Sequence, residues 1–128
     1  MDLKWSSFVS FSNNPVRLDR SVRYGESDAL NFAFTNRIGN KFKSMVGYKL
    51  IVTFRKNNFD KNILLRKEFD ITGTFQHVPI TPNEIRSLGG DGCFWYDAWI
   101  ESDTNIDYEE PLVFGRYEIT YLSKKERV

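Results

Sequence analysis

The stretch Gly47–Lys56, GYKLIVTFRK, has the clearest strand pattern in the chain. The side chains at every second position are apolar: Tyr48, Leu50, Val52 and Phe54. The positions between them are mixed: Lys49, Ile51, Thr53 and Arg55. Because successive side chains of a strand point to opposite faces of its sheet, this alternation predicts a strand with one apolar face.

The segments around this stretch repeat the same period of two. Turn residues in NNFDKN follow it, and ILLRKEFDIT (63–72) resumes the alternation, so the two segments predict a hairpin. Five further segments have strand character: PVRLDRSVRY (15–24), ALNFAFTN (29–36), FQHVPI (75–80), CFWYDAWIE (93–101) and LVFGRYEITYL (112–122). In the first of them, Arg20 interrupts an otherwise apolar row. About seven short strands separated by turns predict an all-β fold, an Ig-like antiparallel β-sandwich.

One segment carries helix signals instead. In TPNEIRSLGG, Thr81 suits the N-cap, Pro82 the first helical position and Glu84 the third, and a Gly-Gly pair ends the pattern. These signals predict one short helix over residues 82–88.

The chain has 128 residues, a length that suits one domain. We expect the sandwich to span residues 13–122. Residues 1–12 are predicted to be an N-terminal arm or a first strand, and residues 123–128 a C-terminal tail.

The charge balance limits the kinds of partner that the chain is expected to bind. Lys and Arg number 18 and Asp and Glu 17, so the formal net charge is only +1. Six basic residues of the first half are expected on solvated strand faces and turns: Arg17, Arg20, Arg23, Arg37, Lys41 and Lys43. This pattern argues against nucleic acid or an anionic membrane as the partner and favours proteins. The N-terminus lacks signal-peptide features, and no apolar run reaches the roughly 18 residues of a membrane span.

The chain contains one cysteine and one histidine. It can therefore form neither an internal disulfide nor a Cys/His zinc cluster, which fits assembly in a reducing cytoplasm. Cys93, His77 and Asp97 are the one set from which a nucleophile, a base and an orienting acid could be built, but nothing in the sequence brings them together. We expect no catalytic residue, no enzymatic activity and no cofactor.

The segment after residue 101 is rich in acids. Two of its carboxylates could act as a glycosidase pair, or several could bind calcium: Asp103, Asp107, Glu109 and Glu110. The alternating acids and glycine of an EF-hand loop are missing, and a solvated acidic loop explains the composition equally well. We expect no metal site.

The predicted strand 93–101 is apolar on both faces. One face carries Trp95, Asp97 and Trp99, and the other carries Phe94, Tyr96, Ala98 and Ile100. The two tryptophans could form a platform for sugar rings. Alternatively, their face packs on the second sheet while the Phe94 face meets a neighbouring subunit or the remaining aromatic surface. We favour core and interface over a sugar site because a strand that is apolar on both faces is expected to be central and covered on both sides. Which face meets the core stays open.

Several short motifs occur in a characteristic order: YGES (24–27), SMVGYKLIVTFRK (44–56), Ile80-Thr81, Glu84, Leu88, Gly92, Phe94, Tyr96-Asp97 and Phe114-Gly115-Arg116-Tyr117. In this order the sequence resembles a family of small Ig-like domains of phage tails and baseplates. The family includes the N-terminal domain of the upper baseplate protein of lactococcal-type siphophages and related fibre-attachment domains.

The resemblance implies a structural protein of a tailed-phage virion, assembled in the host cytoplasm and without catalytic residues. It implies partners among tail, baseplate, fibre or portal-proximal subunits, and we expect a homo-oligomer in the particle. The alternative is a carbohydrate- or receptor-binding module on the virion surface, and a small hydrolase is a third hypothesis.

The candidate partner-binding residues are all aromatic: Trp5, Phe8, Phe11, Trp95 and Trp99. The first three lie in the segment WSSFVSF. That segment either adds a strand to a neighbouring subunit or forms the first strand of the domain itself, and both interpretations stay open.

Overall fold

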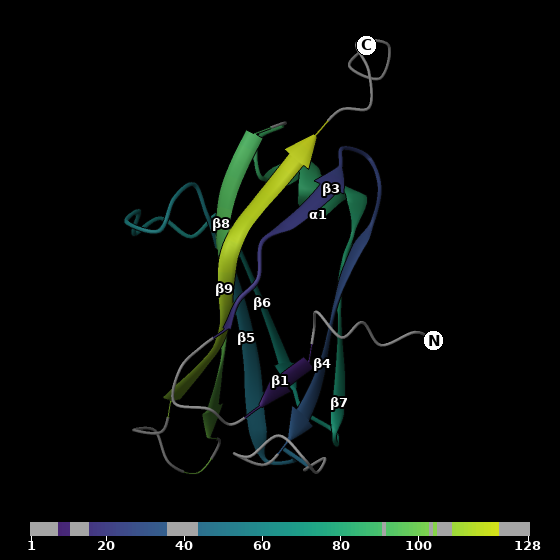
Figure 1. The fold of residues 1–128 in the computed structure, drawn as a ribbon, viewed down its shortest axis with the longest axis vertical. Helices are drawn as coiled ribbons and strands as arrows, with labels where there is room; N and C mark the ends of the chain where they lie inside the picture. The colour runs from purple at the N-terminus through teal and green to yellow at the C-terminus, as the bar shows by residue number, and fades with distance from the viewer. Residues whose placement is uncertain are drawn as a thin grey trace.

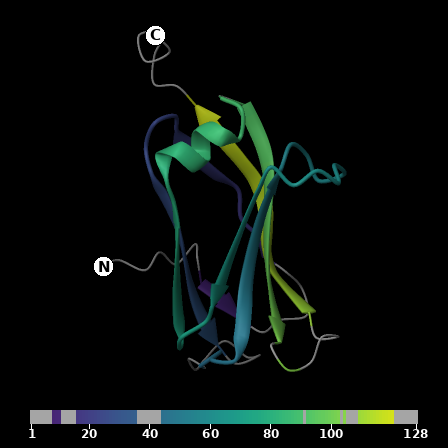
Figure 2. The ribbon, with the colours of Figure 1, turned by 180° about the vertical axis from the view of Figure 1, so that it is seen from behind.

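The computed structural model describes residues 8–10, 16–35, 44–90, 92–102, 104 and 109–120. These residues form two sheets that pack face to face, with one short helix at one end of the sandwich (Figure 1). Figure 2 shows the two layers from behind. The predicted all-β sandwich is therefore confirmed.

The smaller sheet has the strand order β1-β4-β7, and the larger sheet has the order β2-β9-β8-β5-β6, with β3 also beside β9. The strands are β1 (Phe8–Ser10), β2 (Val16–Arg17), β3 (Arg20–Arg23), β4 (Asp28–Thr35), β5 (Tyr48–Arg55), β6 (Leu65–Asp70), β7 (Phe75–Ile80), β8 (Gly92–Ser102) and β9 (Glu109–Thr120). In immunoglobulin terms, β4 and β7 take the places of strands B and E, and β5, β8 and β9 those of C, F and G. β6 extends the larger sheet beside β5, as strand C′ does in variable-type domains.

The alternating apolar side chains of the strands meet between the two sheets. Their inward rows form one cluster, which includes Leu30, Phe32, Phe34, Leu50, Val52, Phe54, Phe94, Tyr96, Ala98, Ile100, Tyr117 and Ile119. At its centre the Phe54 ring lies 5.0 Å from the Tyr117 ring and 6.1 Å from the Tyr96 ring. Burial of these aromatic side chains is a main source of stability, at roughly 1.5–3 kcal/mol for each large apolar side chain.

The segment predicted as one strand over residues 15–24 differs in the structure. It divides into β2 and β3 with a break at Leu18 and Asp19, and both strands pair with β9 in parallel. The break lies against Gly115 of β9, where the Leu18 backbone occupies the space that a side chain would need. A chain that passes so close to β9 cannot keep a regular ladder, so the strand is interrupted there.

The predicted hairpin of β5 and β6 is confirmed, because the two strands pair in antiparallel register. β6 begins at Leu65, later than the alternation predicts, and Ile63 lies in the connecting loop with its side chain 44% exposed. Lys67 joins this edge of the larger sheet to the smaller sheet. Its Nζ donates to the backbone oxygen of Pro79 in β7 and lies 2.8 Å from Glu84 Oε1 in the helix.

The helix α1 (Pro82–Ser87) confirms the predicted helix, with Leu88 as its C-cap. Thr81 is the N-cap: its hydroxyl accepts from the Glu84 amide at 3.1 Å, and the Glu84 carboxylate accepts from the Thr81 amide at 2.9 Å. These two bonds form a capping box, which satisfies amides that a helix start otherwise leaves unpaired. The box fixes the connection between β7 and β8.

We expect the free energy of unfolding to fall in acid, because the Glu84 carboxyl becomes protonated. Burial alone would raise the pKa of this carboxyl, but the hydrogen bonds from Lys67 and Thr81 outweigh it and hold the pKa below its ordinary value of 4.5. A carboxyl with a lowered folded-state pKa stabilises the fold fully above its unfolded pKa, and this contribution is lost as the pH falls through the folded pKa. We expect Glu84→Gln to be less stable than the wild type by about 1 kcal/mol at pH 7, because the capping geometry stays but the charge is lost.

The measurement is urea unfolding of both proteins between pH 7 and pH 3. The gap between their free energies of unfolding should narrow as the pH falls from 4.5 through the lower folded-state pKa, since the wild-type carboxyl then becomes protonated and resembles the amide. A gap that stays constant over this range would contradict the role assigned to the Glu84 charge.

Candidate functional site

The outer face of the larger sheet carries three half-buried aromatic side chains that the core does not use. Trp95 and Trp99 point outward from β8, and Phe114 points outward from β9. The Trp95 and Phe114 rings lie 5.7 Å apart, and the Arg17 guanidinium lies 5.6 Å from the centre of the Trp95 ring. We call Trp95, Trp99 and Phe114 the aromatic face.

The sequence left open which face of strand 93–101 meets the core, and the structure decides it. The Trp95 and Trp99 face does not pack on the second sheet. The opposite face does, and Phe94, Tyr96, Ala98 and Ile100 are buried in the core. The reason is the pairing with β5, in which Leu50 lies opposite Ile100 and Phe54 opposite Tyr96. The inward row of β5 therefore fixes the inward row of β8.

Asp97 lies between the two tryptophans on the same outward row, and its carboxylate is held from β5. The Thr53 hydroxyl donates to Oδ1, and Arg55 Nη1 lies 3.0 Å from Oδ2. Thr53 is fully buried, so its hydroxyl needs this acceptor. At the other tryptophan, Trp99 Nε1 donates to Glu101 Oε1 at 3.0 Å. These hydrogen bonds hold the polar groups around the aromatic face in place in the isolated chain.

A hollow of about 420 Å³ lies within this face, with Arg55, Asp97, Trp99, Pro111 and Phe114 in its wall. It coincides with an irregularity in the pairing of β8 with β9, between Ala98 and Trp99. A bulge there shifts the register of the two strands. The hollow joins apolar rings to a charged pair, a combination typical of recognition sites.

No protein-family model matches this sequence, and no curated protein is similar to it. Among the residues with described structure, no helix is long and apolar enough to cross a lipid bilayer.

The structure does not bring the catalytic candidates together. His77 lies on β7 of the smaller sheet, where its Nδ1 is 2.5 Å from Asn31 Oδ1, whereas Cys93 and Asp97 lie on the outer face of the larger sheet. Cys93 contacts Arg116 instead, with its sulfur 3.1 Å from the Arg116 Nε. Within the described ranges, no group of three or more His, Cys, Asp or Glu side chains is placed to hold a metal ion.

Other candidates are only partly covered. Trp5, Phe11, Arg37, Lys41, Lys43, Asp103 and Asp107 lie outside the described residues. The structure describes the backbone but not the side chains of Phe8, Glu109 and Glu110. The backbone of Phe8 belongs to β1, which pairs with β4 in parallel, with Phe8 opposite Ala33.

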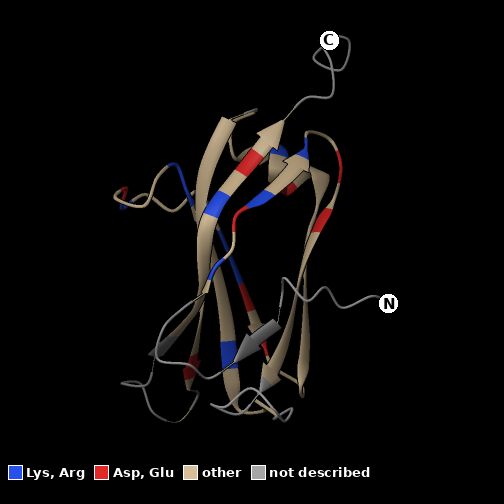
Figure 3. Cartoon of the chain, in the orientation of Figure 1, with Lys and Arg blue, Asp and Glu red and all other residues tan. Residues whose placement is uncertain are grey.

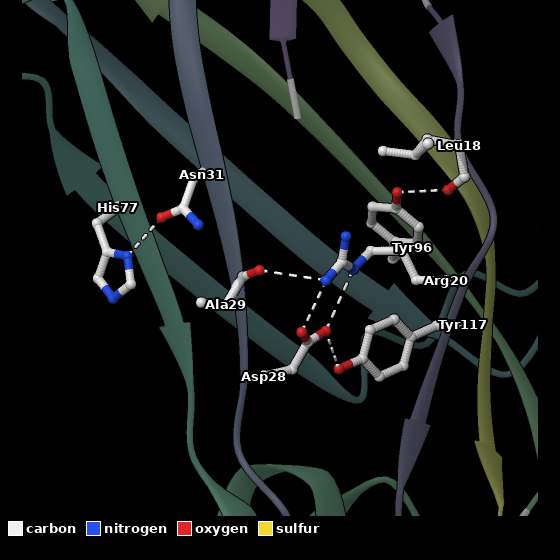
Figure 4. Close-up of polar contacts among 8 residues, drawn as sticks. All are labelled: Leu18, Arg20, Asp28, Ala29, Asn31, His77, Tyr96 and Tyr117. Carbon is white, nitrogen blue, oxygen red and sulfur yellow. Dashed lines mark hydrogen bonds and ion pairs between the residues drawn. The ribbon is translucent and has the colours of Figure 1, made fainter. Parts of the chain in front are cut away.

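Arg20 was predicted on a solvated face, and the structure contradicts this. Its guanidinium lies between the sheets and forms an ion pair with Asp28 of β4, with Nη2 2.7 Å from Oδ1 and side chains only 18% and 13% exposed (Figure 4). Arg20 Nη2 also donates to the Ala29 carbonyl at 3.2 Å. The side chain points inward because it shares the row of Val22, so the polar interruption seen in the sequence marks this buried pair.

Two tyrosines complete the cluster around this pair. The Tyr117 hydroxyl donates to Asp28 Oδ2 at 2.9 Å, and the Tyr96 hydroxyl donates to the Leu18 carbonyl at 2.5 Å (Figure 4). Burial raises the pKa of both tyrosines, so they remain protonated donors. Burial alone would lower the pKa of Arg20, but Asp28 outweighs it and raises the pKa. The ion pair and the Tyr117 hydroxyl bond join the smaller sheet to β3 and β9 of the larger one, and the Tyr96 hydroxyl bond joins β8 to Leu18.

Proposed function

We propose that this protein is a non-enzymatic structural component of a tailed-phage virion, which connects tail, baseplate or fibre parts through its aromatic face. The virion context is supported by the ordered motifs that resemble phage-tail Ig-like domains. The binding role is supported by the structure of the face itself.

The observation that carries the binding role is the set of aromatic rings on the outside of a rigid sheet. Trp95, Trp99 and Phe114 are half-buried although they face away from the core. Tryptophan, tyrosine and arginine dominate the energetics of protein interfaces, because large rigid rings bury much area at low entropic cost. Arg17 and Arg55 beside the rings add groups that interfaces favour.

A second candidate is carbohydrate binding, which is favoured by the position of Trp99 at the rim of the hollow. Two features weigh against it. Both oxygens of Asp97 already accept hydrogen bonds from Thr53 and Arg55, so few acceptors remain for sugar hydroxyls. One side of the Trp95 ring is covered by Arg17. We therefore rank a protein partner first.

Mass spectrometry of particles purified from an infected or induced host tests the virion role. The chain is expected at a fixed ratio to the other structural proteins of the particle. Its absence from particles that are otherwise complete would overturn the proposal.

The role of the face is tested by supplying variants in trans to a phage that lacks the gene. Trp99→Ala should reduce the amount of the chain in particles by at least about tenfold, since a central tryptophan is a typical interface anchor. Phe75→Ala is the control, because Phe75 is also an exposed aromatic residue but lies on β7 of the smaller sheet. If both variants enter particles equally and their circular dichroism is unchanged, the aromatic face is not the surface that binds the particle.

Carbohydrate binding is tested on the purified chain by titrating its tryptophan fluorescence with a panel of host cell-wall saccharides. We expect no saturable change in emission. A saturable change that Trp99→Ala abolishes would instead favour the sugar-binding alternative.

A further inference from the structure

The loop between β5 and β6 projects from the side of the larger sheet that faces away from the smaller sheet (Figures 1 and 2). Near its tip, Phe59 is 88% exposed. The loop is shaped by side-chain bonds to its own backbone: Asn57 Oδ1 accepts from the Phe59 amide at 3.0 Å, and Asp60 Oδ1 accepts from the Asn62 amide at 2.9 Å. Residues 56–64 therefore form an ordered finger with an aromatic tip.

The aromatic tip has a counterpart on the same face of the molecule. The hollow beside Trp99, Pro111 and Phe114 has a volume of about 420 Å³, more than ten times the roughly 30 Å³ that one water fills in the liquid. It can therefore admit a phenyl ring. The finger connects β5 to the edge strand β6, whereas the hollow is lined mainly by residues of β8 and β9, with Arg55 of β5 also in its wall.

The charges near the two features are complementary. The finger carries Lys56 and Lys61 against one acid, Asp60. Beside the hollow, Glu101 holds a carboxylate at the Trp99 ring, and Asp97 in the wall is paired with Arg55, so the two carboxylates outnumber the one cation there. Figure 3 shows that basic and acidic residues alternate over the rest of the larger sheet, which leaves no field of one sign to repel a second copy.

We propose that the aromatic face binds a second copy of this chain, with Phe59 of each copy in the hollow of the other. This inference rests on the proposed function, because it names the partner that binds the same aromatic face. A two-fold axis that lies in the plane of the interface, between finger and hollow, forms both contacts at once. Such an interface is self-complementary and closes as a dimer, which leaves the sheet edges for other subunits.

The outer surface of the larger sheet is large enough for this role. Its strands hold 43 residues, which at about 3.3 Å each and about 4.8 Å between strands cover roughly 680 Å² in plan. The rough surface of side chains and the two fingers add to this area. The total approaches the roughly 800 Å² per partner of a standard protein interface.

The test is sedimentation equilibrium of the purified full chain from 1 to 200 µM, with a reducing agent present so that exposed Cys93 forms no disulfide between copies. We expect a reversible monomer–dimer equilibrium within about this range, as for a weak standard-size interface. Phe59→Ala should raise the dissociation constant about a hundredfold, because each dimer loses two buried phenyl rings. Phe59 is exposed in the monomer, so this change should leave the melting temperature of the monomer unaltered.

The matched control is Phe75→Ala, which removes a 45% exposed phenyl ring from the smaller sheet and should leave the dimer intact. Three results would overturn the proposal: a wild-type chain that stays monomeric throughout, a dimer that Phe59→Ala does not weaken, or equal weakening by Phe75→Ala. These results are independent of the particle analysis. A chain found in particles but monomeric in solution contradicts the self-association alone, whereas a dimer absent from particles contradicts the virion role alone.

Discussion

Replacing Asp28 by asparagine is expected to lower the free energy of unfolding by about 3 kcal/mol, because it leaves the charge of Arg20 buried without its partner. The two side chains are mostly buried between the sheets, and their closest approach is 2.7 Å. The change also takes a charged acceptor away from the Tyr117 hydroxyl. Urea unfolding at pH 7 measures the loss.

Asp19→Asn is the matched control for this variant. Asp19 also pairs with an arginine, Arg17, but both side chains are more than half exposed, so water and salt screen the pair. The amide oxygen of asparagine can still accept the hydrogen bond that the Arg116 amide donates to Asp19. We expect Asp19→Asn to unfold close to the wild type. Equal losses in the two variants would show that the position of the Arg20 pair between the sheets does not matter.

Gly115→Ala is expected to cost about 3 kcal/mol, at the upper end of the usual range for overpacking. A Cβ at this position would lie 2.7 Å from the Leu18 carbonyl carbon and 2.9 Å from Asp19 Oδ1, and still closer to the Leu18 carbonyl oxygen. The obstacle is backbone, so no side-chain rotation relieves it. The break between β2 and β3 must then move away from β9.

The control is Gly73→Ala, where an added Cβ meets no atom within 4 Å. It should change stability by no more than about 0.5 kcal/mol. Gly115→Ala should also alter the fluorescence of Trp95, because Arg17 covers that ring and is next to the displaced Leu18. A Gly115→Ala protein as stable as Gly73→Ala, with unchanged emission, would contradict the close approach.

The parts of the fold that follow from local chemistry are predictable from the sequence. Thr81 and Glu84 form a capping box within four residues, and the alternation in Gly47–Lys56 needs only its own strand. The parallel pairing of β3 with β9 does not follow from local sequence. It joins Arg20 to Tyr117, and no local signal reports a contact over that separation.

The residue types of the candidate site could be predicted from the sequence, but the direction in which its side chains point could not. Trp95 and Trp99 stand out in the sequence, but a strand that is apolar on both faces does not say which face is inward. The register with β5 decides it, and the same register places Thr53 and Arg55 beside Asp97. Arg20 did leave a signal, since an arginine in an apolar row requires a buried partner.

The parallel pairing of β2 and β3 with β9 also sets an order of events during synthesis. Val22 pairs opposite Ile119, so the strand that completes this part of the sheet is made 97 residues later. Hairpins such as β5 and β6 close within microseconds, but β3 must wait for its distant partner. At about 5–20 residues per second, the wait lasts roughly 5–20 s. Throughout that interval the nascent chain exposes the inner surface that β9 later covers, and it is then most open to chaperones or to aggregation.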